Sequence, residues 1–130
     1  MTSRSAFKLL ILSLVVTACG VACSANFSVG GPNQPCFPIA RFENHYGTIA
    51  VQQAGPGGKL AWGVYPKVVA SEYVVDVLVN GRRVDHKNQN YEPHGSINAS
   101  DLSTGALVTI AGHAKGPNGV LNFGLLCRSA

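Results

Sequence analysis

The sequence has little charge and few aromatic side chains, and both shortages limit what the chain can be. Charged residues make up only 12% of the chain and aromatic residues 8%, whereas 46% of the residues are hydrophobic. This balance is too apolar for a disordered chain, and 15 Gly and 7 Pro interrupt it too often for a helical bundle. At 130 residues the length suits one domain of ordinary size. We therefore expect a single domain of short strands joined by many turns.

Motifs of the common enzyme and nucleic-acid-binding classes are also missing. The sequence has no G-x-S-x-G, H-E-x-x-H, H-x-H or C-x-x-C spacing, no phosphate loop and no paired carboxylates. Without Arg4 and Lys8, the segment from Cys19 onward keeps eight basic residues (10 − 2) against six acidic ones, a net charge of +2. These basic residues are scattered and do not favour a nucleic-acid partner. The sequence predicts a protein that is not an enzyme and needs no cofactor.

The one long apolar run, residues 9–18 (LLILSLVVTA), follows two positive charges and no negative one. Such a run has the length of the apolar part of a signal peptide. It ends in Val16-Thr17-Ala18-Cys19, which resembles the bacterial lipobox, in which the Cys receives a lipid and becomes the first residue of the mature protein. The resemblance implies that residues 1–18 are a lipoprotein signal peptide. It also implies that acyl chains such as palmitate attach Cys19 to the outer face of the cell membrane.

Three other interpretations of this region stay open. Residues 9–25 could remain as an uncleaved membrane anchor, although this stretch is at the short end of what spans a bilayer. The lipid could sit on Cys23, which has Ala22 before it but Gly20 where an aliphatic residue is usual. A cut after Ala25 would instead release a soluble secreted protein.

Four cysteines, at positions 19, 23, 36 and 127, are present in a chain that we expect to be exported. Disulfides persist outside the cytoplasm, and if Cys19 is lipidated, the favoured pair is Cys36 with Cys127. That pair would close most of the folded segment, and Cys23 would be left free or in an intermolecular bridge. The rival pairing joins Cys23 to Cys36. Metal binding is not expected, because thiols at the chain ends make a poor tetrahedral set.

The pattern after Cys19 predicts a tether and then a domain. Residues 19–35 have no charge and no period and are rich in Gly and Pro, so we expect a flexible tether. Residues 36–130 are expected to form the domain, beginning with a β-rich stretch within 39–53 and a Gly55-Pro56-Gly57-Gly58 turn. In the next strand, Leu60, Trp62 and Val64 alternate on one face, and Pro66 ends it.

The second half of the chain repeats this pattern of strand and turn. Residues 73–79 (YVVDVLV) lead into Asn80-Gly81, which favours a two-residue hairpin. Further strands are expected near 96–99, over 106–114 and over 120–127, where Leu121, Phe123, Leu125 and Cys127 share a face. Seven short strands and no helix beyond the leader predict an all-β fold, a single antiparallel sandwich of two sheets.

From residue 60 to residue 123 the order of features resembles the fibronectin type III family, within the wider set of immunoglobulin-like sandwiches. Trp62 lies on the second predicted strand, Tyr73 opens the third before a hairpin, and Leu102-Ser103-Thr104-Gly105 leads into a later strand. The chain departs from the family at Val108, where a Tyr is usual, and lacks the Pro common after the Leu. The Cys127 strand also resembles the end of mycobacterial lipoprotein antigens, which implies a bacterial source.

Two groups of exposed residues are candidates for function. Arg82, Arg83, Lys87 and Tyr91 form one basic and aromatic neighbourhood, and the turn with Lys115 and Asn118 lies where type III domains often bind partners; these six are the candidate binding surface. Protection of an exposed sheet edge is the simpler explanation of the basic group. Asp85, His86 and His94 are close in sequence and could meet as a metal site, but a polar surface is favoured, since they lack ligand spacing.

The sequence therefore favours a cell-surface lipoprotein that displays a non-catalytic β-sandwich for binding or interaction, as an envelope accessory or an antigen. Its expected partners are the membrane, through the lipid anchor, and a protein or envelope ligand that the sequence does not identify. A soluble secreted carrier or inhibitor is the alternative. A small metal-dependent enzyme using His86 and His94 is the third and weakest hypothesis.

Overall fold

The structure is a computed structural model that describes residues 24–129, and it contains nine strands and one short 3₁₀ turn. The strands are β1 (Ser24–Pro35), β2 (Ile39–Asn44), β3 (Gly47–Gln53), β4 (Leu60–Pro66), β5 (Glu72–Val79), β6 (Arg82–Gln89), β7 (His94–Ile97), β8 (Leu107–Gly116) and β9 (Gly119–Arg128). The 3₁₀ turn η1 (Ala99–Asp101) follows β7. Within the described residues, no helix is long and apolar enough to span a membrane.

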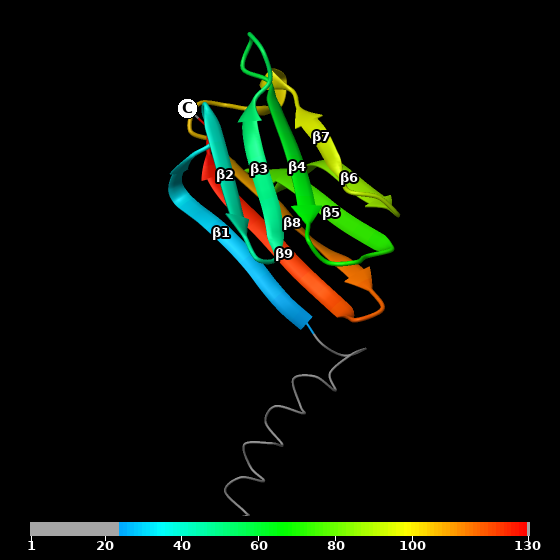
Figure 1. The fold of residues 1–130 in the computed structure, drawn as a ribbon. Coiled ribbons are helices and arrows are strands. Elements are labelled where there is room, and N and C mark those ends of the chain that lie inside the picture. Colours follow the sequence, from blue (N-terminus) through cyan, green and yellow to red (C-terminus); the bar gives the residue numbers. More distant parts are fainter. Residues whose placement is uncertain (1–23, 130) are drawn as a thin grey trace, which may run out of the picture.

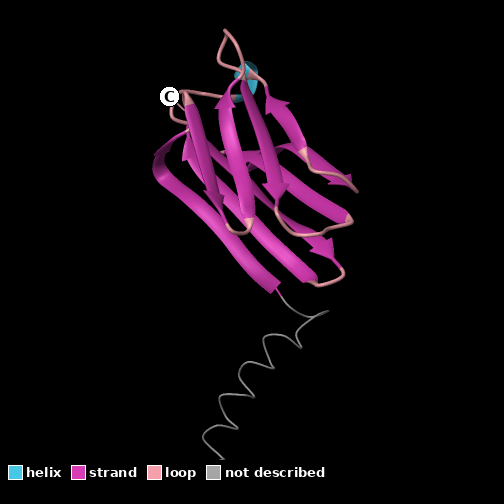
Figure 2. Cartoon of the chain, in the orientation of Figure 1, coloured by secondary structure: helices cyan, strands magenta, loops and turns pink. Residues whose placement is uncertain are grey.

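The strands form two packed sheets, which confirms the predicted all-β sandwich (Figures 1 and 2). One sheet has five strands in the order β1-β9-β8-β5-β6, and the other has four in the order β2-β3-β4-β7. The order β9-β8-β5-β6 is the one that the G, F, C and C′ strands take in immunoglobulin-like sandwiches. The core between the sheets is built mostly from alternate residues of β3, β4, β5, β8 and β9, and most of its side chains are Val, Ile, Leu and Phe.

The predicted tether is wrong for residues 24–35, because they form β1 instead. Ser24 to Gly30 pair in parallel with Val120 to Leu126 of β9, so the sandwich is not purely antiparallel. Phe27 is buried at 4% exposure, and Ala25 and Val29 pack against the core beside it. Pairing with the open edge of β9 provides backbone hydrogen bonds for a segment whose own sequence has no clear strand signal. The rest of the predicted tether, residues 19–23, lies outside the described residues, as does the signal peptide.

The predicted strand positions are largely confirmed, with nine strands in place of seven. The stretch 39–53 is two strands, β2 and β3, paired antiparallel around a turn. At the tip of the β5–β6 hairpin, Asn80 and Gly81 have φ angles of 51° and 82°, the left-handed values that a type I′ turn requires. The strand expected near 96–99 is β7, of the same length and two residues earlier in the chain.

Cys36 and Cys127 form the predicted disulfide. Their Cα atoms are 5.2 Å apart and both residues are fully buried, beside the end of β9. The disulfide joins the connection between β1 and β2 to the last strand, β9. The Cys36 amide also donates a hydrogen bond of 3.0 Å to the Arg128 carbonyl of that strand. The disulfide thus fixes the connection that passes from the five-stranded sheet to the four-stranded sheet, near one end of the sandwich.

The loops and turns of the sandwich gather at its two ends. The lower end in Figure 1 holds the start of β1, the 44–47 turn, the 67–71 loop and the 116–119 turn. The upper end holds the 54–59 loop, the 98–106 segment and Ser129. We refer to them as the lower end and the upper end throughout.

Candidate functional site

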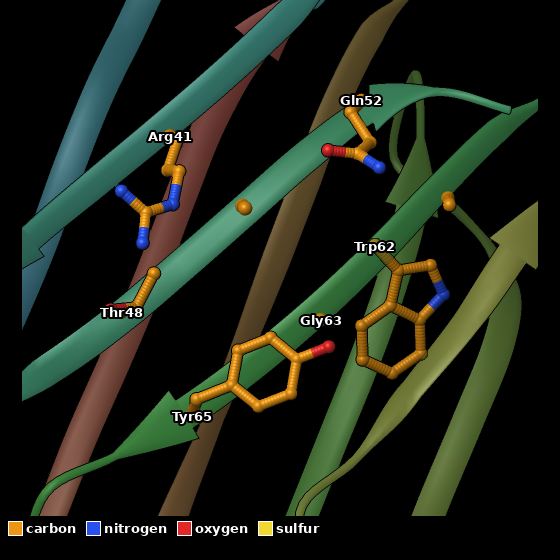
Figure 3. Close-up of a pocket in the computed structure, with 8 residues that line it drawn as sticks. Arg41, Thr48, Gln52, Trp62, Gly63 and Tyr65 are labelled. Carbon is orange, nitrogen blue, oxygen red and sulfur yellow. The ribbon is translucent and has the colours of Figure 1, made fainter.

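A shallow hollow of about 400 Å³ lies on the outer face of the four-stranded sheet (Figure 3). Its lining residues come from β2, β3 and β4, and they are Arg41, Thr48, Ala50, Gln52, Ala61, Trp62, Gly63 and Tyr65. Its size is within the range of small-molecule sites. The hollow exists because three of these residues are small, while larger side chains surround them.

Strand register places the side chains of the hollow in rows across the sheet. Arg41, Ala50 and Gly63 are cross-strand neighbours, and Thr48 is opposite Tyr65. Residues in register lie about 4.5–5.5 Å apart at Cβ, so one ligand can contact a whole row. The first row continues to His94 of β7, which pairs with Gly63 of β4. His94 therefore lies on the sheet that carries the hollow, at its β7 side.

The missing side chain of Gly63 allows Tyr65 to lie over the sheet. A Cβ added at position 63 would collide with the hydroxyl and ring atoms of Tyr65. Figure 3 shows the Tyr65 ring lying along β4 with its hydroxyl beside Gly63. The ring remains 43% exposed, so one face is available to a ligand. Trp62 also borders the hollow, but its indole is 2% exposed and belongs to the core.

Polar groups lie around this aromatic ring. The Arg41 guanidinium points toward Thr48 in Figure 3, and Gln52 stands near the other end of β3. Glu43 lies 3.5 Å from Arg41 and 3.3 Å from Lys67, so one carboxylate is shared between two bases. Ion pairs this exposed contribute little energy, and Arg41 can exchange Glu43 for a ligand at low cost. The hollow therefore offers a guanidinium, a hydroxyl, an amide and an aromatic face.

The six candidate binding residues identified from the sequence do not form one surface. Arg82 and Arg83 pair with the upper part of β5, at Val79 and Leu78, whereas Lys115 pairs with Glu72 at its other end. Seven residues of strand separate Val79 from Glu72 (79 − 72), or about 23 Å. Tyr91 is 62% exposed in the β6–β7 loop, and Asn118 is in the turn next to Lys115.

The basic residues of β6 also have acidic partners. Arg82 lies 3.2 Å from Asp101, Arg83 lies 3.3 Å from Asp76, and Lys87 lies 3.7 Å from Asp85. Since β6 is an edge strand of the five-stranded sheet, charges on it hinder pairing with another chain. The arrangement fits edge protection better than a free basic patch.

Asp85, His86 and His94 do not meet: Asp85 and His86, both on β6, have different hydrogen-bond partners, and His94 is on β7 in the other sheet. His86 Nδ1 lies 2.7 Å from Asp76 Oδ1, and this hydrogen bond is the main reason why the pKa of Asp76 lies below its usual value. Asp85 instead accepts a hydrogen bond of 3.2 Å from the Trp62 indole between the sheets. In the part of the chain that the structure describes, no three His, Cys, Asp or Glu side chains gather in a way that could hold a metal ion.

Sequence reasoning missed Arg41, Thr48, Gln52 and Tyr65. A signal was present, since the face of β4 opposite Leu60, Trp62 and Val64 reads Ala61, Gly63 and Tyr65, two small residues beside an aromatic one. Cys19 and Cys23 lie outside the described residues, so their predicted roles rest on the sequence.

In comparisons with models of known families, with curated proteins and with solved structures, nothing matches this chain significantly.

Proposed function

We propose that this chain is a bacterial surface lipoprotein, attached to the membrane through lipid on Cys19, whose β-sandwich is a non-catalytic binding module. The observation that carries the binding role is the hollow of Arg41, Thr48, Gln52 and Tyr65 on the four-stranded sheet. Its ligand is a polar envelope component with one apolar face, of which a saccharide ring is the simplest example.

The position of β1 supports lipidation on Cys19 over release after Ala25. Ser24 and Ala25 pair with Val120 and Leu121, and Ala25 packs against the core. A cut after Ala25 would remove these two residues from the sheet and expose the surface that they cover. A cut before Cys19 leaves the whole of β1 in place.

The chemistry of the hollow supports a saccharide. The C–H face of a sugar ring packs on an aromatic ring such as Tyr65, while its hydroxyls need donors and acceptors at the rim. Arg41, Thr48 and Gln52 provide both kinds of group on adjacent strands. Hydrolysis would need a free acid and base, and Glu43, the carboxylate paired with Arg41 of the hollow, is also paired with Lys67.

Metabolic labelling with palmitate tests the anchor. The full chain should incorporate labelled palmitate when it is expressed in a bacterium, and Cys19→Ser should abolish the label. Cys23→Ser is the matched control, four residues away, and should keep it. Labelling that survives Cys19→Ser and disappears in Cys23→Ser would move the anchor, and no labelling at all would remove it.

Sedimentation with purified cell-wall polysaccharide tests the binding face. The wild-type protein should sediment with the polysaccharide, and Tyr65→Ala should weaken binding about tenfold, as expected for a central aromatic contact. Tyr91→Ala is the control, because Tyr91 is also an exposed tyrosine but lies on the β6–β7 loop. Equal binding by both variants would contradict the assignment of the site.

A further inference from the structure

Two valines are exposed side by side at the lower end of the sandwich. Val69 is 75% exposed and Val68 39%, in the loop between β4 and β5. Among the described residues they belong to a short set of large exposed apolar side chains, and they are the only pair adjacent in sequence. Transfer of two exposed valine side chains from water to an apolar environment is favourable, so contact of this pair with an apolar partner would stabilise the complex.

The valines border an apolar hollow of about 240 Å³ at the start of β1. Its lining residues are Ser24, Ala25, Tyr46, Val68, Val69, Asn118, Gly119, Val120 and Leu121. Segments from four parts of the chain thus meet at the lower end, and none of their side chains in this hollow is charged. The valines are part of an uncharged and mostly apolar surface and are not an isolated loop feature.

The proposed lipid attachment is next to this surface. Cys19 is five residues before Ser24 (24 − 19), where β1 begins at the lower end. Five residues of fully extended chain span at most about 18 Å. With lipid on Cys19, the lower end therefore cannot move further than this from the point where the acyl chains enter the bilayer. The intervening residues, Gly20 to Cys23, include no charge that would oppose a close approach.

Charge at the lower end is nearly balanced. Lys67 pairs with Glu43 at 3.3 Å, and Lys115 lies in register with Glu72. The lower end therefore carries no strong positive field that would select an acidic protein or depend on anionic lipid. Its apolar surface fits the boundary between lipid headgroups and acyl chains, where shallow insertion buries small apolar groups.

From these observations we infer that the lower end of the sandwich lies against the lipid surface, with Val68 and Val69 inserted at the headgroup boundary. The inference rests on the proposed attachment at Cys19. Burial of two valine side chains gains too little free energy to hold a domain on a membrane without an anchor. The valine contact therefore sets the orientation of a domain that the lipid already holds.

This orientation has a consequence for the binding face. The strands run from the lower end to the upper end, and β9 has ten residues, a length of about 33 Å. With the lower end on the bilayer, the Tyr65 hollow faces sideways, parallel to the membrane. The upper end, with Thr104, is then held about that distance from the lipid.

A tryptophan placed at either end tests the inference. The full lipidated chain, reconstituted into phosphatidylcholine vesicles that contain brominated lipid, is compared as Val69→Trp and Thr104→Trp. Both positions are exposed, and the native Trp62 is a buried background common to both. Brominated lipid should quench the added emission of Val69→Trp and leave that of Thr104→Trp unchanged. Equal emission and quenching at the two positions would overturn the inference.

Because tryptophan itself favours the membrane interface, the wild-type valines need a separate measurement. Hydrogen exchange of residues 67–71 should be slower on vesicles than in dilute detergent for the wild type, and Val69→Asp should remove the difference. Exchange that is the same on vesicles for wild type and Val69→Asp would contradict the contact. Replacing a quarter of the phosphatidylcholine with phosphatidylglycerol, a fraction on the order of that in anionic membranes, should change neither result.

The mass of the same samples separates this inference from the proposed function. If Cys19 carries lipid and Val69→Trp is not quenched, the orientation is wrong and the anchor stands. If the mass shows no lipid, the Trp variants are tethered through a histidine tag before residue 19 to vesicles with nickel-chelating lipid. Quenching at Val69→Trp alone would then support the surface without the native anchor, and equal quenching would refute it.

Discussion

Different kinds of contact stabilise the two ends of the sandwich. At the upper end, the Cys36–Cys127 disulfide joins the β1–β2 connection to β9, and the Arg128 guanidinium donates to the carbonyls of Pro32 and Gly105, both at 2.7 Å. At the lower end, backbone bonds from Lys67 to Tyr46 and from Ser71 to Lys115 hold the loops, and apolar side chains are left at the surface. The upper end is held by a disulfide as well as by hydrogen bonds, whereas the described contacts at the lower end, such as backbone hydrogen bonds and the Lys67–Glu43 ion pair, include no disulfide.

This difference fits an end that faces water and an end that faces lipid. Contacts such as Arg128 with Pro32 satisfy backbone groups where chain segments converge in water. An apolar surface beside the proposed lipid anchor would instead gain free energy from the bilayer, and a disulfide there would add nothing to that contact. The comparison predicts that disruption of the upper end costs stability, whereas changes at the exposed lower surface alter membrane contact and leave stability nearly unchanged.

Removal of the disulfide should have the largest effect. The Cys36→Ala/Cys127→Ala variant loses a cross-link between residues 91 apart in sequence. A closed loop of this length contributes about 4 kcal/mol in the chain-entropy model, so we expect a loss of this order in the free energy of unfolding. Urea denaturation of the two proteins measures it. A loss well below 1 kcal/mol, on the scale of an ordinary surface substitution, would show that the upper end does not depend on the bridge.

Ser129→Ala should have the next largest effect. Ser129 is 6% exposed, and its hydroxyl accepts from the Ala106 amide at 2.8 Å and donates to the Ser103 carbonyl at 2.9 Å. Loss of this hydroxyl should cost about 1 kcal/mol, because two side-chain hydrogen bonds disappear while the Ala106 amide keeps its backbone bond of 3.0 Å to the Ser103 carbonyl. Ser103→Ala is the control: the contact uses its carbonyl, not its side chain, and it should stay within about 0.5 kcal/mol of wild type. Equal effects would contradict this role of Ser129.

Alkaline pH should lower the free energy of unfolding through ionisation of Tyr73, which lies at the start of β5 at the lower end. Burial first, and then the negative charge of Glu92, raise the pKa of Tyr73 above its usual value of 10.0. The pKa of Tyr73 is thus higher in the folded state than in the unfolded state. Its neutral side chain contributes stability that is fully present below the pKa of the unfolded state and is lost as the pH rises through the pKa of the folded state. Above about pH 10, Tyr73→Phe should therefore lose less stability than wild type, as measured by denaturation at pH 8 and pH 11. Parallel losses in the two proteins would rule out a role for Tyr73.

The sequence alone was sufficient to predict the fold class, the Asn80-Gly81 hairpin and the Cys36–Cys127 pair. Those signals are local or depend on few alternatives, such as positive φ angles at Asn-Gly. The strand β1 was not predictable in this way, since Ser24 to Gly30 become a strand only because the edge of β9 is free beside them. Tertiary context determines such a strand more than its own residues do.

The candidate site was less predictable than the fold. Reasoning from sequence selected charged residues on β6, but the structure pairs Arg82, Arg83 and Lys87 with acidic side chains. The hollow depends on the register of β2, β3 and β4, which places Arg41 beside Ala50 and Gly63. Small residues such as these carry no chemical signal of their own, and only their alignment across the sheet makes a site.

The smallest expected effect on stability, from Val69→Ser, is the sharpest test of the comparison. Val69 is 75% exposed, so its replacement should change the free energy of unfolding by no more than about 0.5 kcal/mol. Val75→Ala is the matched control on the adjoining strand, fully buried, and should cost about 1–3 kcal/mol. On vesicles the order should reverse, because Val69→Ser should lose the slow hydrogen exchange of residues 67–71 and Val75→Ala should keep it. If Val69→Ser destabilises the protein as much as Val75→Ala does, the valine is part of the fold, and the lower end needs no lipid to explain it.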